Sequence, residues 1–324
     1  MKALLCKKHG GPEDLVLEDI ESPKVCDEQV LITVKACGVN FPDTLIIRGL
    51  YQFKPALPFS PGSDVAGVIK AIGDEVKHLK VGDEVIALVP HGGFAEECLA
   101  DANIVFPKPQ NMSFVNAASF LMAYGTSYHA LKDRANLQKG ETMLVLGASG
   151  GVGLTAVELG KVMGAKVIAA ASTTEKLDLC KEYGADEVIN YREEDLKARV
   201  KELTGGKGVD VVYDPVGGDY TEAALRATGW KGRYLVIGFA AGRIPKIPLN
   251  LPLLKGCAIV GVFWGAFAQR EPKNNFTNTQ ELLKWFYSGD IKPHIHKVFP
   301  LAEAAEALKE LEERKVRGKV VIRM

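Results

Sequence analysis

The stretch TMLVLGASGGVG (residues 142–153) runs directly into LTAVELGKVMGA (residues 154–165), so an apolar strand ends in a glycine-rich turn and a helix begins at once. In such a turn Gly147 permits the tight bend, Gly150 lets the backbone approach a diphosphate, and Gly153 lets the helix pack closely on the strand. The free N–H groups at the start of the helix then face the phosphates. The spacing is G-x-x-G-x-x-G rather than G-x-G-x-x-G, but the context of strand, turn and helix predicts a dinucleotide site.

Strands and helices alternate along the rest of this half of the chain. Near-continuous apolar strands joined by amphipathic helices are typical of a parallel sheet covered on both faces. We therefore expect an α/β fold with a Rossmann-type, doubly wound parallel sheet. The expected strands are residues 142–147, 166–171, 187–190, 209–214, 233–238 and 258–263, and the expected helices are 152–163, 174–183, 193–203 and 220–227.

The N-terminal part has a different pattern. Short alternating segments, frequent turns and several prolines favour a β-rich domain without long helices. Helical spacing over 116–131 marks the change of pattern, and a helix at 301–314 and a strand at 319–323 are expected to return to the first domain. The predicted domains are residues 1–120, 121–265 and a C-terminal segment, 266–324.

The second strand of the dinucleotide site indicates which nucleotide binds. NAD sites usually carry an Asp or Glu about 20 residues beyond the glycines, where it binds the ribose 2′-hydroxyl. Here that count reaches Ala170, Ala171 and Ser172, none of which is charged. Ser172 can donate a hydrogen bond and Lys176 supplies a positive charge, although in isolation Lys176 would be read as an exposed helix lysine. Together these features favour NADPH over NADH.

Composition limits the other classes of function. The 40 basic and 40 acidic side chains cancel, so charge gives no support for binding nucleic acid. The 6 cysteines are scattered without a C-x-x-C pair, as in a reducing compartment. No apolar run approaches the ~20 residues of a membrane helix. We expect a cytoplasmic protein that does not enter a membrane.

Several segments carry a resemblance to a known family, and they are ACGVNFPD (36–43), LPFSPG (57–62), Gly140-Glu141, ASGGVG (148–153) and Gly318-Lys319. Through them the whole chain resembles the zinc-free quinone oxidoreductase (zeta-crystallin-like) branch of the medium-chain dehydrogenase/reductase superfamily. One position departs from the family, because Glu158 stands where its signature usually has Gln.

The resemblance implies a GroES-like β-rich domain, a Rossmann domain and an active site between them. It also implies a set of NADPH-contacting residues, of which the last three match the family less closely. They are Asn40, Thr126, Gly150, Gly151, Val152, Ser172, Lys176, Tyr191, Phe239, Phe263 and Arg314.

Zinc-dependent members of the superfamily hold the metal with a Cys, the His of a G-H-E motif and a second Cys. The matching residues here are Asn40, Ser63 and Met122, whereas a catalytic zinc site needs three protein ligands. His294 and His296 come nearest to a metal pair, and we expect them in a surface loop. We therefore expect no metal.

Without zinc, hydride addition to a carbon activated by conjugation, as in a quinone or another conjugated carbonyl compound, is the favoured reaction. By resemblance Tyr51 is a candidate hydrogen-bond donor to the oxygen that gains charge, while a packing role and a solvent proton remain open. Asn40 and Asp43 are expected to shape the nicotinamide end. The aromatic residues of 263–267 are read as either core or a wall of the site.

Two other functions remain open. One is a reductase specific for an activated alkene, such as an alkenal or an acrylyl thioester, and the other is a nucleotide-binding structural protein without turnover. We also expect a homodimer formed by pairing the sixth strands, residues 258–263, because a bare apolar edge strand is an aggregation hazard. The expected partners are thus a small electron-poor molecule and a second copy of the chain.

Overall fold

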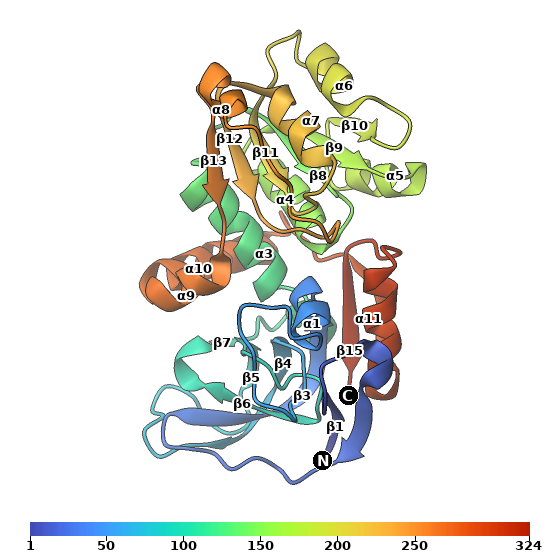
Figure 1. The fold of residues 1–324 in the computed structure, drawn as a ribbon. Coiled ribbons are helices and arrows are strands. Elements are labelled where there is room, and N and C mark those ends of the chain that lie inside the picture. Colours follow the sequence, from blue (N-terminus) through green and yellow to red (C-terminus); the bar gives the residue numbers. More distant parts are fainter. The chain divides into compact units, whose positions relative to one another are not determined.

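The structure is a computed structural model that describes residues 1–324, in which the chain forms two compact units. The first unit contains Met1–Met122 and Pro293–Met324, and the second contains Ala123–Lys292 (Figure 1). The chain therefore passes between the units twice. The second unit continues past residue 265, where the sequence placed the end of the dinucleotide-binding domain.

The second unit is built on a six-stranded sheet in the order β10-β9-β8-β11-β12-β13, with every neighbouring pair parallel. Its strands are β8 (Thr142–Leu146), β9 (Lys166–Ala171), β10 (Glu187–Asn190), β11 (Val209–Asp214), β12 (Thr228–Val236) and β13 (Ala258–Gly261). Successive strands proceed outward from β8 in one direction and from β11 in the other. The predicted doubly wound α/β fold is confirmed.

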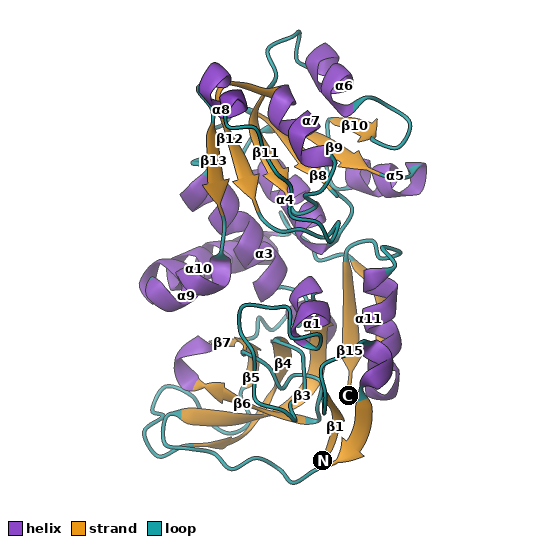
Figure 2. Cartoon of the chain, in the orientation of Figure 1, coloured by secondary structure: helices purple, strands orange, loops and turns teal.

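Helices cover both faces of this sheet (Figure 2). They are α4 (Gly151–Val162), α5 (Thr174–Glu182), α6 (Leu196–Leu203), α7 (Tyr220–Ala227) and α8 (Asn250–Lys255). Alternate strand residues face opposite sides: Leu144 and Ile168 join the core beneath α6, α7 and α8. Met143 and Val167 instead lie against Gly160 of α4, where an added Cβ would be 2.5 Å from the Met143 side chain. Burial on both faces explains why the central strands β8, β9 and β11 are mainly apolar.

The helix expected over 116–131 is interrupted. The structure has α2 (Phe114–Ala117), α3 (Leu121–Tyr128) and a π-helical stretch at His129–Arg134. The break follows from packing, because a Cβ added to Gly38 of the first unit's sheet would lie 2.0 Å from the Ala118 carbonyl oxygen. Helical spacing cannot reveal such a contact, so the expectation of one continuous helix was wrong.

Two helices follow β13 where the sequence indicated none. They are α9 (Trp264–Arg270) and α10 (Pro272–Ser288). The buried positions of α10 include Asn278 and Thr279 as well as Leu282 and Leu283. Polar residues on the buried face weaken the apolar periodicity by which a helix is recognised in sequence.

The first unit contains a seven-stranded sheet in the order β14-β15-β3-β4-β5-β7, with β6 also paired to β3, and a separate pair, β1 and β2. The strands are β1 (Lys2–Leu5), β2 (Val16–Asp19), β3 (Gln29–Val39), β4 (Asp64–Ile72), β5 (Glu84–Leu88), β6 (Glu97–Asp101), β7 (Val105–Pro107), β14 (Ile295–Pro300) and β15 (Lys319–Arg323). Its helices α1 (Phe41–Ile46) and α11 (Ala304–Glu312) are joined by an Arg48–Glu312 ion pair at 2.8 Å. This β-rich unit is the expected GroES-like domain.

The C-terminal strand completes this sheet. β15 pairs antiparallel with β3, which brings Val320 opposite Val39. His296 lies within β14, so the expectation of a surface loop was wrong for this residue, whereas His294 lies in the loop directly before the strand; both side chains are half-buried. The residues of β14 form a strand because they pair in parallel with β15. None of the helices is long and apolar enough to span a bilayer.

Candidate active site

The glycine-rich turn joins β8 to α4 in the second unit. Gly147 has φ +56°, in the left-handed region that favours glycine, and Gly150 caps α4. A Cβ at Gly153 would lie 2.2 Å from the Gly147 carbonyl oxygen, so only glycine allows this approach of helix and turn. At Gly150 the nearest atom would be 3.3 Å away. The narrow turn therefore leaves room for a diphosphate to approach the first backbone N–H groups of α4.

The ends of the neighbouring strands present the other residues expected at the nucleotide. Ser172 directly follows β9, and the Lys176 ammonium lies 3.5 Å from its hydroxyl oxygen. Tyr191 directly follows β10, and its ring packs against that of Tyr220 at 4.3 Å between centroids. Ser172 thus gives the end of β9 a hydroxyl in place of a carboxylate, and Lys176 on α5 adds a cation beside it, a combination that suits a phosphate.

Helix α3 carries Thr126. The neighbouring Ser127 is fully buried, and its hydroxyl donates to the Val152 carbonyl oxygen at 2.9 Å. The Ser127 Oγ is also 2.8 Å from both the Thr155 and the Tyr213 hydroxyl oxygens. Ser127 therefore fixes α3 to the start of α4. Nothing in the sequence pattern distinguishes this serine, because its partners are brought together only by folding.

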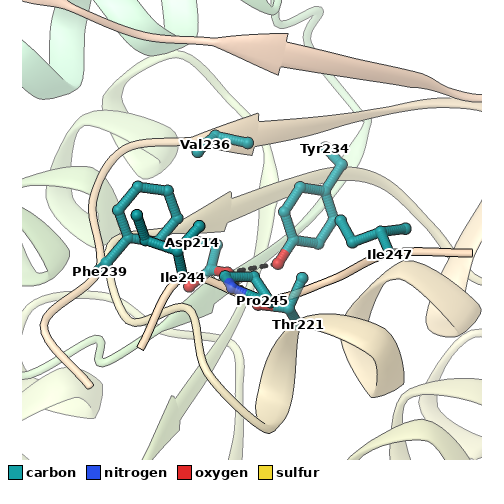
Figure 3. Close-up of a pocket in the computed structure, with 8 residues that line it drawn as sticks. All are labelled: Asp214, Thr221, Tyr234, Val236, Phe239, Ile244, Pro245 and Ile247. Carbon is teal, nitrogen blue, oxygen red and sulfur yellow. Dashed lines mark hydrogen bonds between the residues drawn. The ribbon is translucent and has the colours of Figure 1, made fainter. Parts of the chain in front are cut away.

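The turn after β11 is organised by one buried carboxylate, Asp214, and Figure 3 shows the Tyr234 hydroxyl pointing toward it. Asp214 accepts hydrogen bonds from the Val216 and Gly217 N–H groups, each at 2.8 Å. It also accepts from the Thr221 hydroxyl at 3.2 Å and from the Tyr234 hydroxyl. Burial and this neighbouring carboxylate raise the pKa of Tyr234 well above its usual range. Asp214 therefore has its acceptor capacity satisfied and holds the turn that ends β11.

The two phenylalanines expected near the cofactor have different surroundings. Phe239 lines a pocket of about 170 Å³ beside Asp214 together with Val236 and Ile244 (Figure 3). Phe263 is the exposed residue that precedes α9.

The other aromatic residues of 263–267 belong to the core. Trp264 packs against Gly125 and donates to Asn275 at 3.0 Å, and Phe267 stacks on His129 with 3.9 Å between ring centroids. Of the two interpretations of the aromatic residues, Trp264 and Phe267 therefore fit a role in core packing and not one in lining the site.

In the first unit, Asn40 and Asp43 begin α1. The Asp43 carboxylate accepts from the Asn40 N–H at 2.7 Å and from the Gly62 N–H at 3.3 Å. Burial raises the pKa of Asp43 to about 7, although these two donors and the Lys319 charge oppose the shift. Asp43 therefore fixes the backbone around Asn40.

A buried lysine holds the Asn40 side chain. The Lys319 ammonium donates to Asn40 Oδ1 and, at 3.3 Å, to the Val39 carbonyl oxygen. Asp64 is fully buried, and neither carboxylate oxygen has a hydrogen bond; its nearest cation is Lys319, 3.8 Å from Oδ2. Burial raises the pKa of Asp64 to about 6 and lowers that of Lys319. Sequence reasoning gave Asp64 and Lys319 no role, since Lys319 and Asn40 are 279 residues apart.

The remaining expected residues of this unit are Tyr51 and Arg314. Tyr51 is half-buried against the hydrophobic core, and burial, with a smaller effect of the Asp43 charge, raises its pKa. Arg314 is an exposed residue just after α11 with φ +58°. The structure thus groups Tyr51, Asn40 and Asp43 in one unit, and the glycine turn, Thr126, Ser172, Lys176 and Tyr191 in the other.

The positions matched to zinc ligands do not fit zinc. The Asn40 amide oxygen is already bonded to Lys319, and no group of three or more His, Cys, Asp or Glu side chains is placed to hold a metal ion. A catalytic zinc needs three such ligands and an open position.

The fold and these residues define a class of protein, one with a GroES-like unit and a Rossmann unit that carries a nucleotide-type glycine turn. Residues 26–110 match the family described as alcohol dehydrogenase GroES-like domain, and residues 151–285 match the one described as zinc-binding dehydrogenase.

Individual relatives define the branch. The quinone oxidoreductase-like protein 2 homolog of Nematostella vectensis is 41% identical over 99% of this chain and 88% of its own length. Human quinone oxidoreductase is 37% identical, with 95% of this chain and 92% of that protein covered. The crystal structure of Escherichia coli quinone oxidoreductase complexed with NADPH is 32% identical, with a TM-score of 0.93 over 100% of both chains. The chain belongs to the quinone oxidoreductase branch of the medium-chain dehydrogenase/reductase superfamily.

Replacing Lys319 with Met should lower the free energy of unfolding by about 3–5 kcal/mol at pH 8, because it leaves buried carboxylates without a cation. The loss should be smaller at pH 5, where the raised pKa values of Asp43 and Asp64 keep both carboxyls largely protonated in the folded state. Urea unfolding at both pH values measures this difference. Adding Asp64→Asn to Lys319→Met should restore much of the stability, and an equal loss at both pH values would contradict the ion-pair interpretation.

Proposed function

We propose that this protein is an NADPH-dependent oxidoreductase that transfers hydride to a quinone or another conjugated carbonyl compound. The observation that carries the proposal is the glycine turn at β8 combined with Ser172, in place of a carboxylate, directly after β9 and with Lys176 beside it. Membership of the quinone oxidoreductase branch supports it, as does the NADPH complex of the Escherichia coli relative.

The residues of the second unit fit this cofactor. The N–H groups of Gly151 and Val152 would hold the diphosphate at the start of α4, and Gly150, whose own N–H donates to the Gly147 carbonyl oxygen at 3.0 Å, would let the backbone approach it. Ser172 and Lys176 would bind the 2′-phosphate, and the Tyr191 ring would pack against the adenine. Thr126, Phe239, Phe263 and, from the first unit, Arg314 complete the proposed set.

The residues of the first unit act near the reacting atoms. When bound, NADPH supplies a hydride. Asn40, held by Lys319 and by the Asp43-bound backbone, orients the nicotinamide end through its amide group. Tyr51 donates a hydrogen bond to the substrate oxygen that gains negative charge, and the proton that completes the reduction comes from Tyr51 or from solvent.

The reaction proceeds without zinc in this proposal, because the three matched ligand positions hold Asn40, Ser63 and Met122. Conjugation in the substrate, rather than a Lewis acid, activates the accepting carbon. All six cysteines are free thiols, which supports a reducing compartment, and we place the protein in the cytoplasm.

The proposed assembly is a homodimer through β13. This strand is at the edge of its sheet, and Ile259 on it is partly exposed. Trp230, Leu253 and Leu254 are each more than two-thirds exposed, and Trp230 lies beside Gly256 between α8 and β13. A second copy pairing with β13 would extend the sheet and cover this apolar surface.

The function is tested by cofactor binding and by turnover. NADPH should bind much more tightly than NADH in a fluorescence titration. Lys176→Ala should weaken NADPH binding by about tenfold, since a hydrogen bond to a charged group contributes about 1.5 kcal/mol. NADH binding should not change, and Lys181→Ala on the same helix serves as the control. Equal affinity for the two cofactors would overturn the assignment.

Turnover with 1,4-benzoquinone, 2-alkenals and acrylyl thioesters then identifies the acceptor. Quinone reduction that survives a zinc chelator supports the proposal. Activity confined to alkenals or thioesters would identify an alkene reductase, and tight NADPH binding without any turnover would indicate a structural role.

Tyr51→Phe should lower kcat more than it raises KM. Removing one such donor costs about 10²–10³-fold where nothing replaces it, and less where water takes its place. The defect should be larger with an alkenal than with a quinone, because a quinone accepts its second proton readily from solvent. NADPH affinity should stay constant. Steady-state kinetics with both acceptors measure this, and an unchanged kcat for both would reduce Tyr51 to a packing residue.

Light scattering at micromolar concentration should give the mass of a dimer. Ile259→Lys should shift the protein toward the monomer, because it places a charge in the proposed pairing strand. Tyr287→Lys replaces another exposed apolar residue, on α10, and should leave the dimer intact. A monomeric wild-type protein would refute the proposed interface.

A further inference from the structure

Glu158 is a buried carboxylic acid in the middle of α4 to which neither the fold nor the proposed chemistry assigns a role. Its side chain accepts two hydrogen bonds within the second unit. The Tyr124 hydroxyl donates to Oε2 at 2.6 Å, and the Lys292 backbone N–H donates to Oε1 at 2.7 Å. Tyr124 is itself almost wholly buried.

These two donors occupy special places in the chain. Tyr124 is the second residue after the chain enters the second unit, and Lys292 is the last residue before it leaves. One carboxyl group therefore holds both segments through which the second unit is connected to the first. Tyr124 also lies on α3 two residues before Thr126, and Glu158 lies on the helix that begins with the glycine turn.

Helix α3 is thus attached to α4 by two kinds of hydrogen bond. The first kind joins neutral groups, with the Ser127 hydroxyl donating to the Val152 carbonyl oxygen and the Thr155 hydroxyl donating to the Ala123 carbonyl oxygen at 3.3 Å, and the second is the Tyr124–Glu158 hydrogen bond. Only the second kind contains a carboxyl group that can ionise. A hydrogen bond to a carboxylate is shorter and about twice as strong as one between neutral groups.

We infer that Glu158 is a positioning residue for the cofactor site, whose ionised carboxylate secures α3 and the segment ending at Lys292 to α4 and so strengthens NADPH binding. The inference rests on the proposed function, because it takes Thr126 and the glycine turn as cofactor contacts. Ionisation of Glu158 should then make the affinity for NADPH depend on pH.

Burial raises the pKa of Glu158 to about 7, and its two hydrogen bonds and the Lys292 charge oppose the shift. The titratable groups that face it are Tyr124 on α3, Tyr183 after α5, and Lys292. Burial raises the pKa of both tyrosines, and the Glu158 charge adds to this effect, so both stay neutral near pH 7. Glu158 is therefore the group in this cluster that changes charge between pH 6 and pH 8.5.

As pH rises, ionisation of Glu158 should lower the stability of the fold and raise the affinity for the cofactor. Between the unfolded pKa near 4.5 and the folded pKa near 7, the folded state holds a proton that the unfolded state has lost. Stability from this group is therefore lost as pH rises through that window. Cofactor affinity should increase as pH rises, because the ionised form makes the stronger hydrogen bonds.

Glu158→Gln is the matching variant, because its amide keeps the shape and, like the protonated acid, can accept from the Lys292 N–H and donate to the Tyr124 oxygen, but cannot ionise. NADPH affinity of the variant and of the wild type should agree at pH 6, and the wild type should bind at least about twofold more tightly at pH 8.5. The ratio of the two affinities removes the titration of the cofactor phosphate, which both proteins share. Calorimetry in buffers of different ionisation enthalpy should show more proton release on binding by the wild type.

Glu281→Gln is the control. Glu281 accepts a hydrogen bond from Tyr128, also on α3, at 2.6 Å, but Lys132 and Tyr128 keep its pKa below the usual value. It is already ionised at pH 6, so this variant should retain the wild-type pH profile.

Two measurements without cofactor separate this inference from the proposed function. The Glu158→Gln variant should gain in Tm relative to the wild type between pH 5 and pH 8.5, and its Lys292 amide should exchange hydrogen faster at pH 8.5. If NADPH does not bind, the proposed function fails. If, in addition, the Tm difference between Glu158→Gln and the wild type does not change with pH and the Lys292 amide exchanges at the same rate in both, the structural role of Glu158 fails as well. If NADPH binds with the same pH profile in both proteins, the inference about Glu158 is overturned.

Discussion

The close approach of α4 to the end of β8 is the constraint on which the second unit depends. The helix can begin where it does because Gly153 has no side chain, since a Cβ there would meet the Gly147 carbonyl oxygen at 2.2 Å. That approach brings the N–H groups of α4 to the carboxyl edge of the sheet, where the strand order reverses. Ser172, Tyr191 and the Asp214 turn then lie at the ends of the strands on either side.

The first unit depends on a different kind of interaction, a cluster of charges removed from water. Asp43, Asp64 and Lys319 are all buried, so two acids share one cation. Such a cluster is costly, because Asp64 is fully buried and its nearest cation, Lys319, is 3.8 Å away. What the arrangement provides is a fixed orientation of Asn40, whose amide oxygen and backbone N–H are both held. Stability is lost locally in exchange for a defined geometry at the proposed nicotinamide end.

Sequence reasoning succeeded where a residue's role depends on its neighbours in the chain. The strands β9, β10 and β11 begin and end at the expected residues, because uninterrupted apolar runs bounded by turns define buried strands. It failed at α10, whose buried face includes Asn278 and Thr279, and at 116–131, where Ala118 packs on Gly38. In both places the deciding partner is distant in sequence.

The sequence by itself determined the Rossmann fold, the glycine turn and the uncharged end of β9, because each is a property of one short segment. Only the tertiary structure determined that Lys319 reaches Asn40, that Ser127 meets Val152, and that Glu158 holds Tyr124 and Lys292. The physical reason is that a charge or hydrogen-bonding group gains its role from the partners and the burial it acquires on folding. A local pattern can place a strand or a turn, but it contains no information on which distant group will share its proton or its charge.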